Sequence, residues 1–148
     1  MNPIRTVQAL LLLLVAGCID PAVTPDTTGT EKNAAVQLYE NTFDSTLSIP
    51  GRISMVDFIL PTCGACLFMD STVDSLAVRF KNQALIARVD LSEESALGSE
   101  FSIRTVPTFL FFESGTEVRR VIGAVKEDSL ASILDSMISE SQKGGSVE

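Results

Sequence analysis

The stretch VDFILPTCGAC, residues 56–66, joins the end of an apolar run to two cysteines that stand three positions apart. Apolar residues fill most of 52–60, a pattern typical of a β-strand that is covered on both faces. A Cys-x-x-Cys pair directly after such a strand has four interpretations: a redox dithiol, half of a zinc site, a structural disulfide, or two small buried residues.

The residues that the chain lacks weaken one of these interpretations, and the short loop between the cysteines weakens another. A zinc site needs four ligands, usually Cys or His, and the chain has no histidine and only Cys18 besides Cys63 and Cys66. Copper delivery would also normally need a histidine. A disulfide that closes so short a loop adds little stability, because it removes little chain entropy. We therefore expect no metal. A cysteine pair alone is weak evidence, so the choice among the other interpretations needs more of the sequence.

Composition limits the class of protein further. A chain of 148 residues with 45% hydrophobic residues fits one globular domain. The net charge is −8 and no basic cluster is present, so nucleic acid is not an expected partner. Without histidine, any acid or base must be a carboxylate, Lys, Tyr, Cys or water.

The beginning of the chain has the layout of a secretory signal. Arg5 precedes an apolar stretch at 9–16, which is short for a membrane span, and small residues then lead to Cys18. The sequence VAGC, 15–18, closely resembles a bacterial lipobox, in which cleavage before the cysteine and diacylation of its sulfur anchor the mature protein in a bilayer. In the alternative, an ordinary signal peptide is cut nearby and leaves Cys18 as a free thiol.

Composition divides the chain into four parts. Residues 1–17 are expected to be the lipoprotein signal peptide, and 18–33, rich in Thr, Pro, Asp and Gly, a lipidated cysteine followed by a flexible tether. Residues 34–140 form the folded domain, and the polar residues 141–148 are expected to be a disordered tail.

Within the domain, strand and helix patterns alternate in the order βαβαβαββα. Leu67, Phe68, Val73, Leu76, Ala77 and Phe80 recur at helical spacing after the second cysteine. Asn41 is a candidate helix cap. Strands are expected at 34–40, 52–60, 84–91, 107–114 and 116–123, and helices at 41–48, 65–80, 94–102 and 126–140.

Residues 34–140 resemble a thioredoxin. VDFILPTCGAC is similar to the family's strand and active-site segment, in which Asp57 stands six positions before the first cysteine. IRTVPTFLFFESG, 103–115, is similar to the segment that carries the family's cis-proline, here Pro107, and Gly123 matches a glycine of the last strand. The resemblance implies an α/β, thioredoxin-like three-layer sandwich, with a central mixed β-sheet flanked by helices.

The resemblance also implies the chemistry of the site. Cys63, at a helix N-terminus that stabilises a thiolate, would be the nucleophile, and Cys66 the resolving thiol. The redox element is then the Cys63–Cys66 disulfide, with no cofactor. Asp57 is the candidate proton relay for the resolving thiol if burial raises its pKa. The alternative is that Asp57 faces solvent.

Five residues are expected to bind the substrate chain: Gly64, Ala65, Val106, Pro107 and Thr108. A cis bond before Pro107 would let the backbone of Val106 pair with an extended peptide, with Val106 and Thr108 flanking the groove. Alternatively, Pro107 only begins a strand. Arg88, where many thioredoxins have a lysine, either screens Asp57 or is a surface charge.

Two departures from the family bear on function. Thr62 replaces the tryptophan before the first cysteine, so the apolar surface is reduced or rebuilt from Ile59, Leu60 and Pro61. Ala65 replaces the proline between the cysteines, and no histidine stands there, which favours a reductase over a strong oxidant. The alternatives are a disulfide oxidase or isomerase, or a binding or chaperone-like module without turnover.

The expected partners follow from these assignments. They are protein thiols and disulfides, a membrane electron donor, and a lipid bilayer reached through Cys18; a monomer is expected. The expected location is the cell envelope, on the outer face of the cytoplasmic membrane or on the outer membrane facing the periplasm.

Overall fold

The computed structural model describes residues 33–144, and the proposed signal peptide, Cys18 and most of the tether lie outside this range. The described elements follow the order βαβαβαββα, which confirms the order predicted from the sequence. They are β1 (Val36–Gln37), α1 (Glu40–Leu47), β2 (Ile53–Ile59), α2 (Gly64–Arg79), β3 (Ala84–Asp90), α3 (Ser95–Glu100), β4 (Thr108–Glu113), β5 (Thr116–Ile122) and α4 (Glu127–Gly144).

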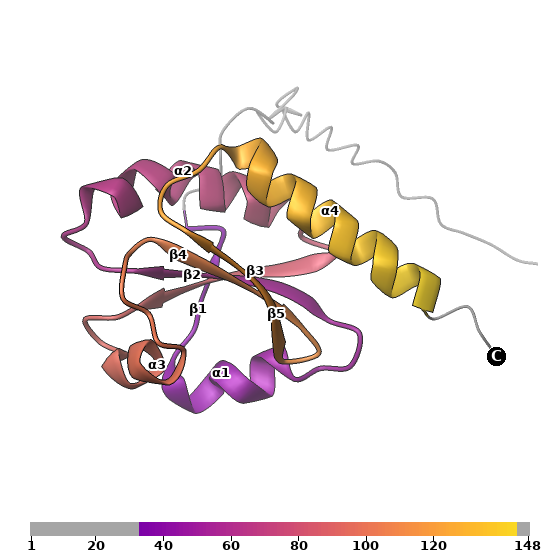
Figure 1. Ribbon diagram of the computed structural model, residues 1–148, viewed down its shortest axis with the longest axis horizontal. Helices are drawn as coiled ribbons and strands as arrows, with labels where there is room; N and C mark the ends of the chain where they lie inside the picture. The colour runs from indigo at the N-terminus through magenta and orange to yellow at the C-terminus, as the bar shows by residue number, and fades with distance from the viewer. Residues whose placement is uncertain (1–32, 145–148) are drawn as a thin grey trace, which may run out of the picture.

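The strands form one mixed sheet in the order β1-β3-β2-β4-β5 (Figure 1). β1, β3 and β2 are parallel, whereas β4 is antiparallel to β2 and β5 is antiparallel to β4. α2 and α4 cover one face of the sheet, and α1 and α3 cover the other (Figure 1). The predicted three-layer sandwich is therefore confirmed.

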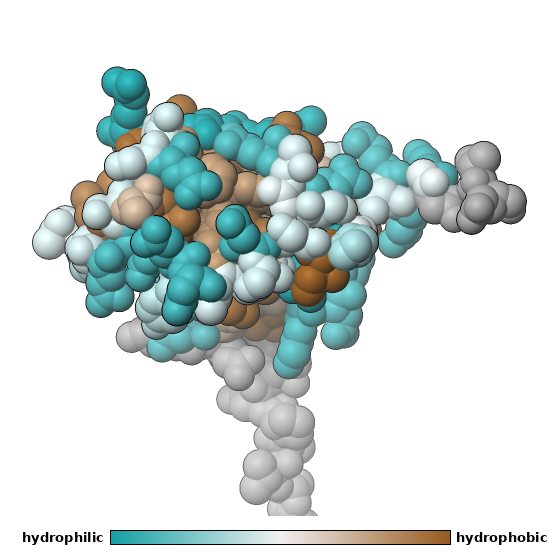
Figure 2. All heavy atoms as spheres, turned by 90° about the horizontal axis from the view of Figure 1, so that it is seen from below, coloured by the Kyte–Doolittle hydropathy of each residue, from teal (hydrophilic) through white to brown (hydrophobic). Residues whose placement is uncertain are grey.

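β2 is buried at nearly every position because each face of the sheet has its own core. Side chains alternate along a strand, so Ile53 and Met55 point toward α2 and α4, whereas Val56 and Phe58 point toward α1 and α3. The second core carries a group of aromatic rings, with the centroids of Phe43 and Phe101 5.0 Å apart. Polar side chains cover much of this face from outside, with apolar residues visible between them (Figure 2).

The first strand and first helix differ from the sequence prediction. β1 has only two residues, because the backbone N–H groups of Asn33 and Ala35 donate to the carboxylate of Asp74 on α2 rather than to a strand. α1 begins after Tyr39 instead of Asn41, and the Tyr39 N–H donates to Thr42 Oγ1 at 3.3 Å. Asn41 is therefore inside the helix and does not cap it.

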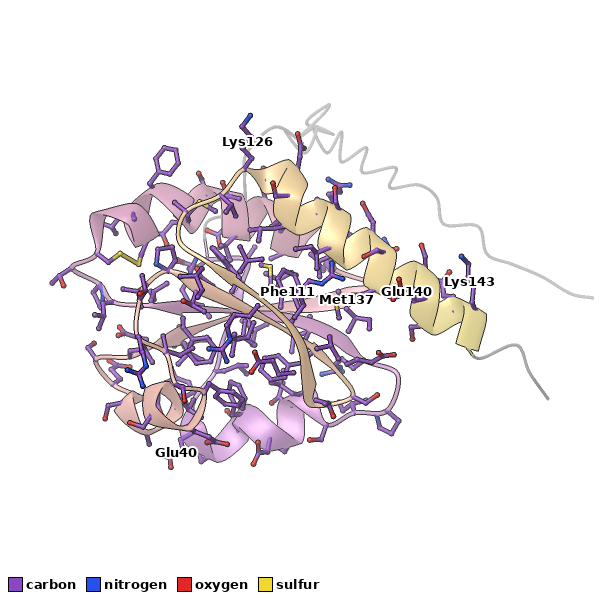
Figure 3. All side chains as sticks on the ribbon, in the orientation of Figure 1. Glu40, Phe111, Lys126, Met137, Glu140 and Lys143 are labelled. Carbon is purple, nitrogen blue, oxygen red and sulfur yellow. A yellow bond between two sulfur atoms is a disulfide. The ribbon has the colours of Figure 1, made fainter. Side chains whose placement is uncertain are left out.

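The last helix is longer than predicted. α4 continues past Glu140 to Gly144, so part of the segment predicted as a disordered tail is helical. Lys143 lies in the last turn, where a cation interacts favourably with the helix dipole. Glu140 and Lys143 are labelled in Figure 3. Within residues 33–144, no helix combines the length and apolar character needed to cross a membrane.

Candidate active site

The two cysteines lie where β2 passes into α2. Cys63 is the N-cap of α2, and its Sγ accepts a hydrogen bond from the Cys66 N–H at 3.1 Å. The two sulfurs form a disulfide, which lies at the N-terminal end of α2 (Figure 3). An N-cap side chain meets backbone N–H groups that lack partners within the helix, and these favour negative charge. When the pair is reduced, Cys63 is therefore the sulfur better placed to be a thiolate.

The two sulfurs differ in their access to solvent. Cys63 is half-buried, whereas Cys66 is only 1% exposed. Gly64 and Ala65, the residues between them, are both exposed. An incoming disulfide can therefore reach Cys63 more easily than Cys66, and the roles of nucleophile and resolving thiol stay predictions.

The segment before β4 lies against the disulfide. The Val106–Pro107 bond is cis, and the Val106 carbonyl oxygen is 3.7 Å from Cys63 Sγ. The Pro107 carbonyl accepts a hydrogen bond from the Gly123 N–H at 2.8 Å. Gly123 has φ = +86°, a backbone conformation that favours glycine. Three segments that are distant in the sequence thus meet at the N-terminal end of α2.

Thr108 does not flank an open groove, contrary to the sequence prediction. Its side chain is 2% exposed, and its hydroxyl donates to the Thr105 carbonyl at 2.6 Å. Thr108 is the first residue of β4 and lies on the face of that strand that points toward α1 and α3, together with Leu110. It therefore braces the loop before Pro107, and half-buried Val106 remains the residue beside the nucleophile.

Asp57 is fully buried, so the alternative that it faces solvent is wrong. It follows Ile53 and Met55 on the face of β2 that α2 covers, in the layer that also contains Cys66. Burial raises the pKa of Asp57 from its ordinary value of 3.8 to about 7, opposed by the positive charge of Arg88 and assisted by the negative charge of Asp70. Such a carboxyl can both accept and release a proton near neutral pH.

Arg88 is part of the site and not a surface charge. It is paired in register with Asp57 on the neighbouring strand, and its side chain is 12% exposed. The Arg88 Nε lies 3.9 Å from Asp57 Oδ2, and the Arg88 Nη2 lies 3.4 Å from Asp70 Oδ1. Asp70 was not predicted from the sequence. Residues four positions apart lie on the same side of a helix, so the spacing between Cys66 and Asp70 could have identified Asp70 as a site residue.

The apolar residues at the start of α2 also differ from the prediction. Leu67 and Phe68 fit the helical spacing of core residues, yet they are 60% and 76% exposed. At this end of α2, the residues buried against the sheet are Cys66 and Met69. The first turns of α2 thus expose two large apolar side chains, although the chain has no tryptophan.

Comparison with known proteins agrees with this geometry. The family model for thioredoxin matches residues 34–136. The chain belongs to the thioredoxin family. It is 36% identical over 81 residues to thioredoxin 1 of Synechococcus elongatus, covering 55% of this chain and 76% of that protein. It is 30% identical over 103 residues to thioredoxin 1 of a Nostoc species, covering 70% of this chain and 96% of that protein.

Membership of the thioredoxin family assigns the reaction class. The protein is a thiol-disulfide oxidoreductase that acts on protein disulfides, and its redox element is the Cys63–Cys66 disulfide. Over residues 33–144, no three His, Cys, Asp or Glu side chains gather as a metal site would require.

Proposed function

We propose that the protein is a membrane-tethered reductase of protein disulfides. The observation that carries the reductase assignment is the environment of the cysteine pair: an accessible sulfur at the start of α2, with only Gly64 and Ala65 between it and the buried sulfur. No charged or aromatic group stands between the cysteines to add to the stability of the Cys63 thiolate, and such added stability is what makes a dithiol strongly oxidising.

The reaction begins with reduced cysteines. The Cys63 thiolate attacks one sulfur of the partner's disulfide, so that a mixed disulfide forms and the other partner sulfur leaves as a thiolate and takes up a proton. The Cys66 thiol then gives its proton to Asp57, and its thiolate attacks Cys63 Sγ. The Cys63–Cys66 bond forms, and the second partner sulfur leaves and is protonated.

The electron balance then requires a donor. The partner disulfide gains two electrons and two protons. The Cys63–Cys66 pair supplies both electrons and the one proton that Cys66 gives to Asp57, and water supplies the other proton, because Cys63 reacts as a thiolate. Outside the cytoplasm, a dithiol of a membrane protein is the class of donor that would reduce the pair again. We propose the cell envelope as the location, because a lipid on Cys18 and the following tether would hold the domain beside a membrane.

The redox potential of the pair tests the direction of electron flow. We expect equilibration with glutathione to give a potential at the reducing end of the family's range, as a reductase needs. A potential as high as that of a strong oxidant would overturn the reductase assignment in favour of an oxidase.

Trapping tests turnover and the roles of the two sulfurs. Cys66→Ser leaves Cys63 able to attack but unable to be released, so mixed disulfides with partners should accumulate. Cys63→Ser is the matched control and should trap none. Partner binding that survives Cys63→Ser without any disulfide exchange by the wild type would instead identify a binding module.

Lipidation is tested independently. The VAGC sequence at 15–18 motivates it, and Cys18→Ser should move the protein from the membrane fraction to the soluble fraction. A wild-type protein that is already soluble, with a free Cys18 by intact mass, would show that the tether is absent and would leave the redox assignment unchanged.

A further inference from the structure

Arg88 lies between the carboxylates of Asp57 and Asp70 and forms no hydrogen bond of ordinary length with either. Both carboxyl oxygens of Asp57 and the Nε and Nη2 atoms of Arg88 are buried and have no hydrogen-bond partner. A guanidinium next to a buried carboxylate ordinarily forms two short charge-assisted hydrogen bonds, about 2.7 to 2.9 Å long. The nearest approach of Arg88 to Asp57 is 3.9 Å, and its approach to Asp70 is closer, at 3.4 Å.

The two carboxylates differ in exposure. The side chain of Asp57 is fully buried, whereas that of Asp70 is 42% exposed. Water can solvate the Asp70 carboxyl group at the rim of the site, so this group does not carry the cost of burial that Asp57 carries. Asp70 lies on α2 and Arg88 on β3, so this contact also joins the helix that carries the cysteines to the sheet.

We propose that Asp70 is a positioning residue of the redox site, which draws the Arg88 guanidinium toward the rim and keeps it from closing on Asp57. Asp57 is thereby left buried without the charge-assisted hydrogen bonds that would fix it as a carboxylate. The inference rests on the proposed role of Asp57 as the proton acceptor of the resolving step.

Among residues 33–144, only Arg88 and Asp70 contribute a charge that acts on the pKa of Asp57. Its partner in register on β4 is Phe109, and α4 contributes apolar side chains such as Leu130 and Leu134 to the core on this face. On α2, the cysteines are joined as a disulfide in the oxidised protein. Burial is the largest cause of the raised pKa of Asp57, and Arg88, which lowers that pKa, and Asp70, which raises it, are the charges that act on it.

The test is the titration of Asp57 in the oxidised full-length protein, followed by the carbon-13 NMR shift of its carboxyl group. Asp70→Asn keeps the size of the side chain and removes its charge, so Arg88 is free to bind Asp57. We expect the midpoint of Asp57 to move down by about one pH unit. Asp135→Asn is the matched control, because it removes a carboxylate 3.2 Å from Arg79, and it should leave the midpoint unchanged.

A second pair of variants separates positioning from simple charge repulsion. With Arg88→Met as the background, Asp70→Asn can remove only the repulsion between two carboxylates, and the downward shift should be less than half as large. An unchanged or higher midpoint in Asp70→Asn would overturn the proposal. An equal shift with and without the arginine would also overturn it, because Asp70 would then act by its charge alone. Arg88→Gln serves as the background if Arg88→Met does not fold.

Kinetics then distinguish failure of this inference from failure of the relay. If Asp57 acts as the base, the pH dependence of mixed-disulfide resolution should move with its NMR midpoint in Asp70→Asn. A midpoint that moves while the kinetic profile does not would support the positioning role of Asp70 and remove Asp57 from the proton-transfer step.

Discussion

Asp57 is a charged type of residue placed where a water-soluble protein ordinarily places an apolar one. An isolated ionised carboxylate costs several kcal/mol to bury, and a carboxyl that escapes this cost by taking up a proton has a raised pKa. The shift to about 7 therefore follows from the position of Asp57 under α2, with Arg88 only partly compensating. Asp57 is thus unfavourable for folding but suited to proton transfer, as expected of a residue that is kept for function.

The first prediction concerns the rate of the resolving step. Asp57→Asn should slow release of the mixed disulfide about a hundredfold near pH 7, because the Cys66 thiol then lacks its proton acceptor. Attack by Cys63 should be little changed. Stopped-flow measurement of the two steps checks this, and a variant that resolves at the wild-type rate would contradict the relay.

The second prediction concerns stability and pH. Because the pKa of Asp57 is about 7 when folded and 3.8 ordinarily, the folded protein binds more protons between these values. The free energy of unfolding should therefore fall as pH rises from about 4 to 7, by on the order of 4 kcal/mol. Urea unfolding of the oxidised protein should show this slope, and Asp57→Asn should lack it. Asp44→Asn, which changes an exposed residue of α1, should retain it.

At the scale of elements, α2 serves three purposes with three parts of its surface. Its N-cap presents Cys63, its buried side packs on the sheet, and its outer side leaves Leu67 and Phe68 in solvent. Further along the helix, Asp74 is only 4% exposed and receives hydrogen bonds from the backbone where the described chain begins. One helix thus positions both the nucleophile and the backbone of the segment that precedes β1.

The third prediction contrasts the two sides of α2. Leu76→Ala should lower the free energy of unfolding by about 2 to 5 kcal/mol, because a fully buried side chain leaves a cavity in the core. Phe68→Ser should change it by less than about 0.5 kcal/mol, since that ring is mostly exposed. Chemical denaturation of both variants measures the difference. Similar losses in the free energy of unfolding would contradict the prediction, because they would mean that other residues pack over Phe68.

The fourth prediction concerns the link between Asp74 and the beginning of the domain. Asp74→Ala should destabilise the protein by about 1 to 3 kcal/mol, because the backbone N–H groups of Asn33 and Ala35 lose their acceptor. Glu140→Ala, on the exposed side of α4 and away from its N-terminus, is the control and should have little effect. Amide hydrogen exchange at residues 33–35 should rise only in the first variant.

At the scale of the whole molecule, stability comes from two apolar cores on the two faces of one sheet, and the disulfide lies at the margin of the first. The cores are built around β2 and β4, whose residues are nearly all buried. The Cys63–Cys66 bond spans a sequence separation of only three, so it constrains little of the unfolded chain. The fold can therefore persist in both redox states, as repeated turnover requires.

The fifth prediction tests this independence. A Cys63→Ala/Cys66→Ala variant should keep the wild-type fold and lose no more than about 2 kcal/mol of the free energy of unfolding. Circular dichroism and urea unfolding of both proteins measure it. Loss of the folded state would show that the disulfide is structural.

The sequence by itself determined the element order, the cysteine pair and the family. Strand and helix periods are local, and the motif around Cys63 keeps its residue types at fixed spacing, so neither needs long-range contacts to be recognised. Local patterns also misled: Phe68 fits the apolar period of α2, yet whether a helix side is covered depends on what packs against it.

Only the tertiary structure decided the electrostatics of the site. Neither the burial of Asp57 nor the place of Arg88 between two carboxylates is visible in the sequence, because β2, β3 and α2 supply one group each and no short segment contains all three. Proton affinity depends on solvent exclusion and on charges within a few ångströms, and the chain sets both only when it folds.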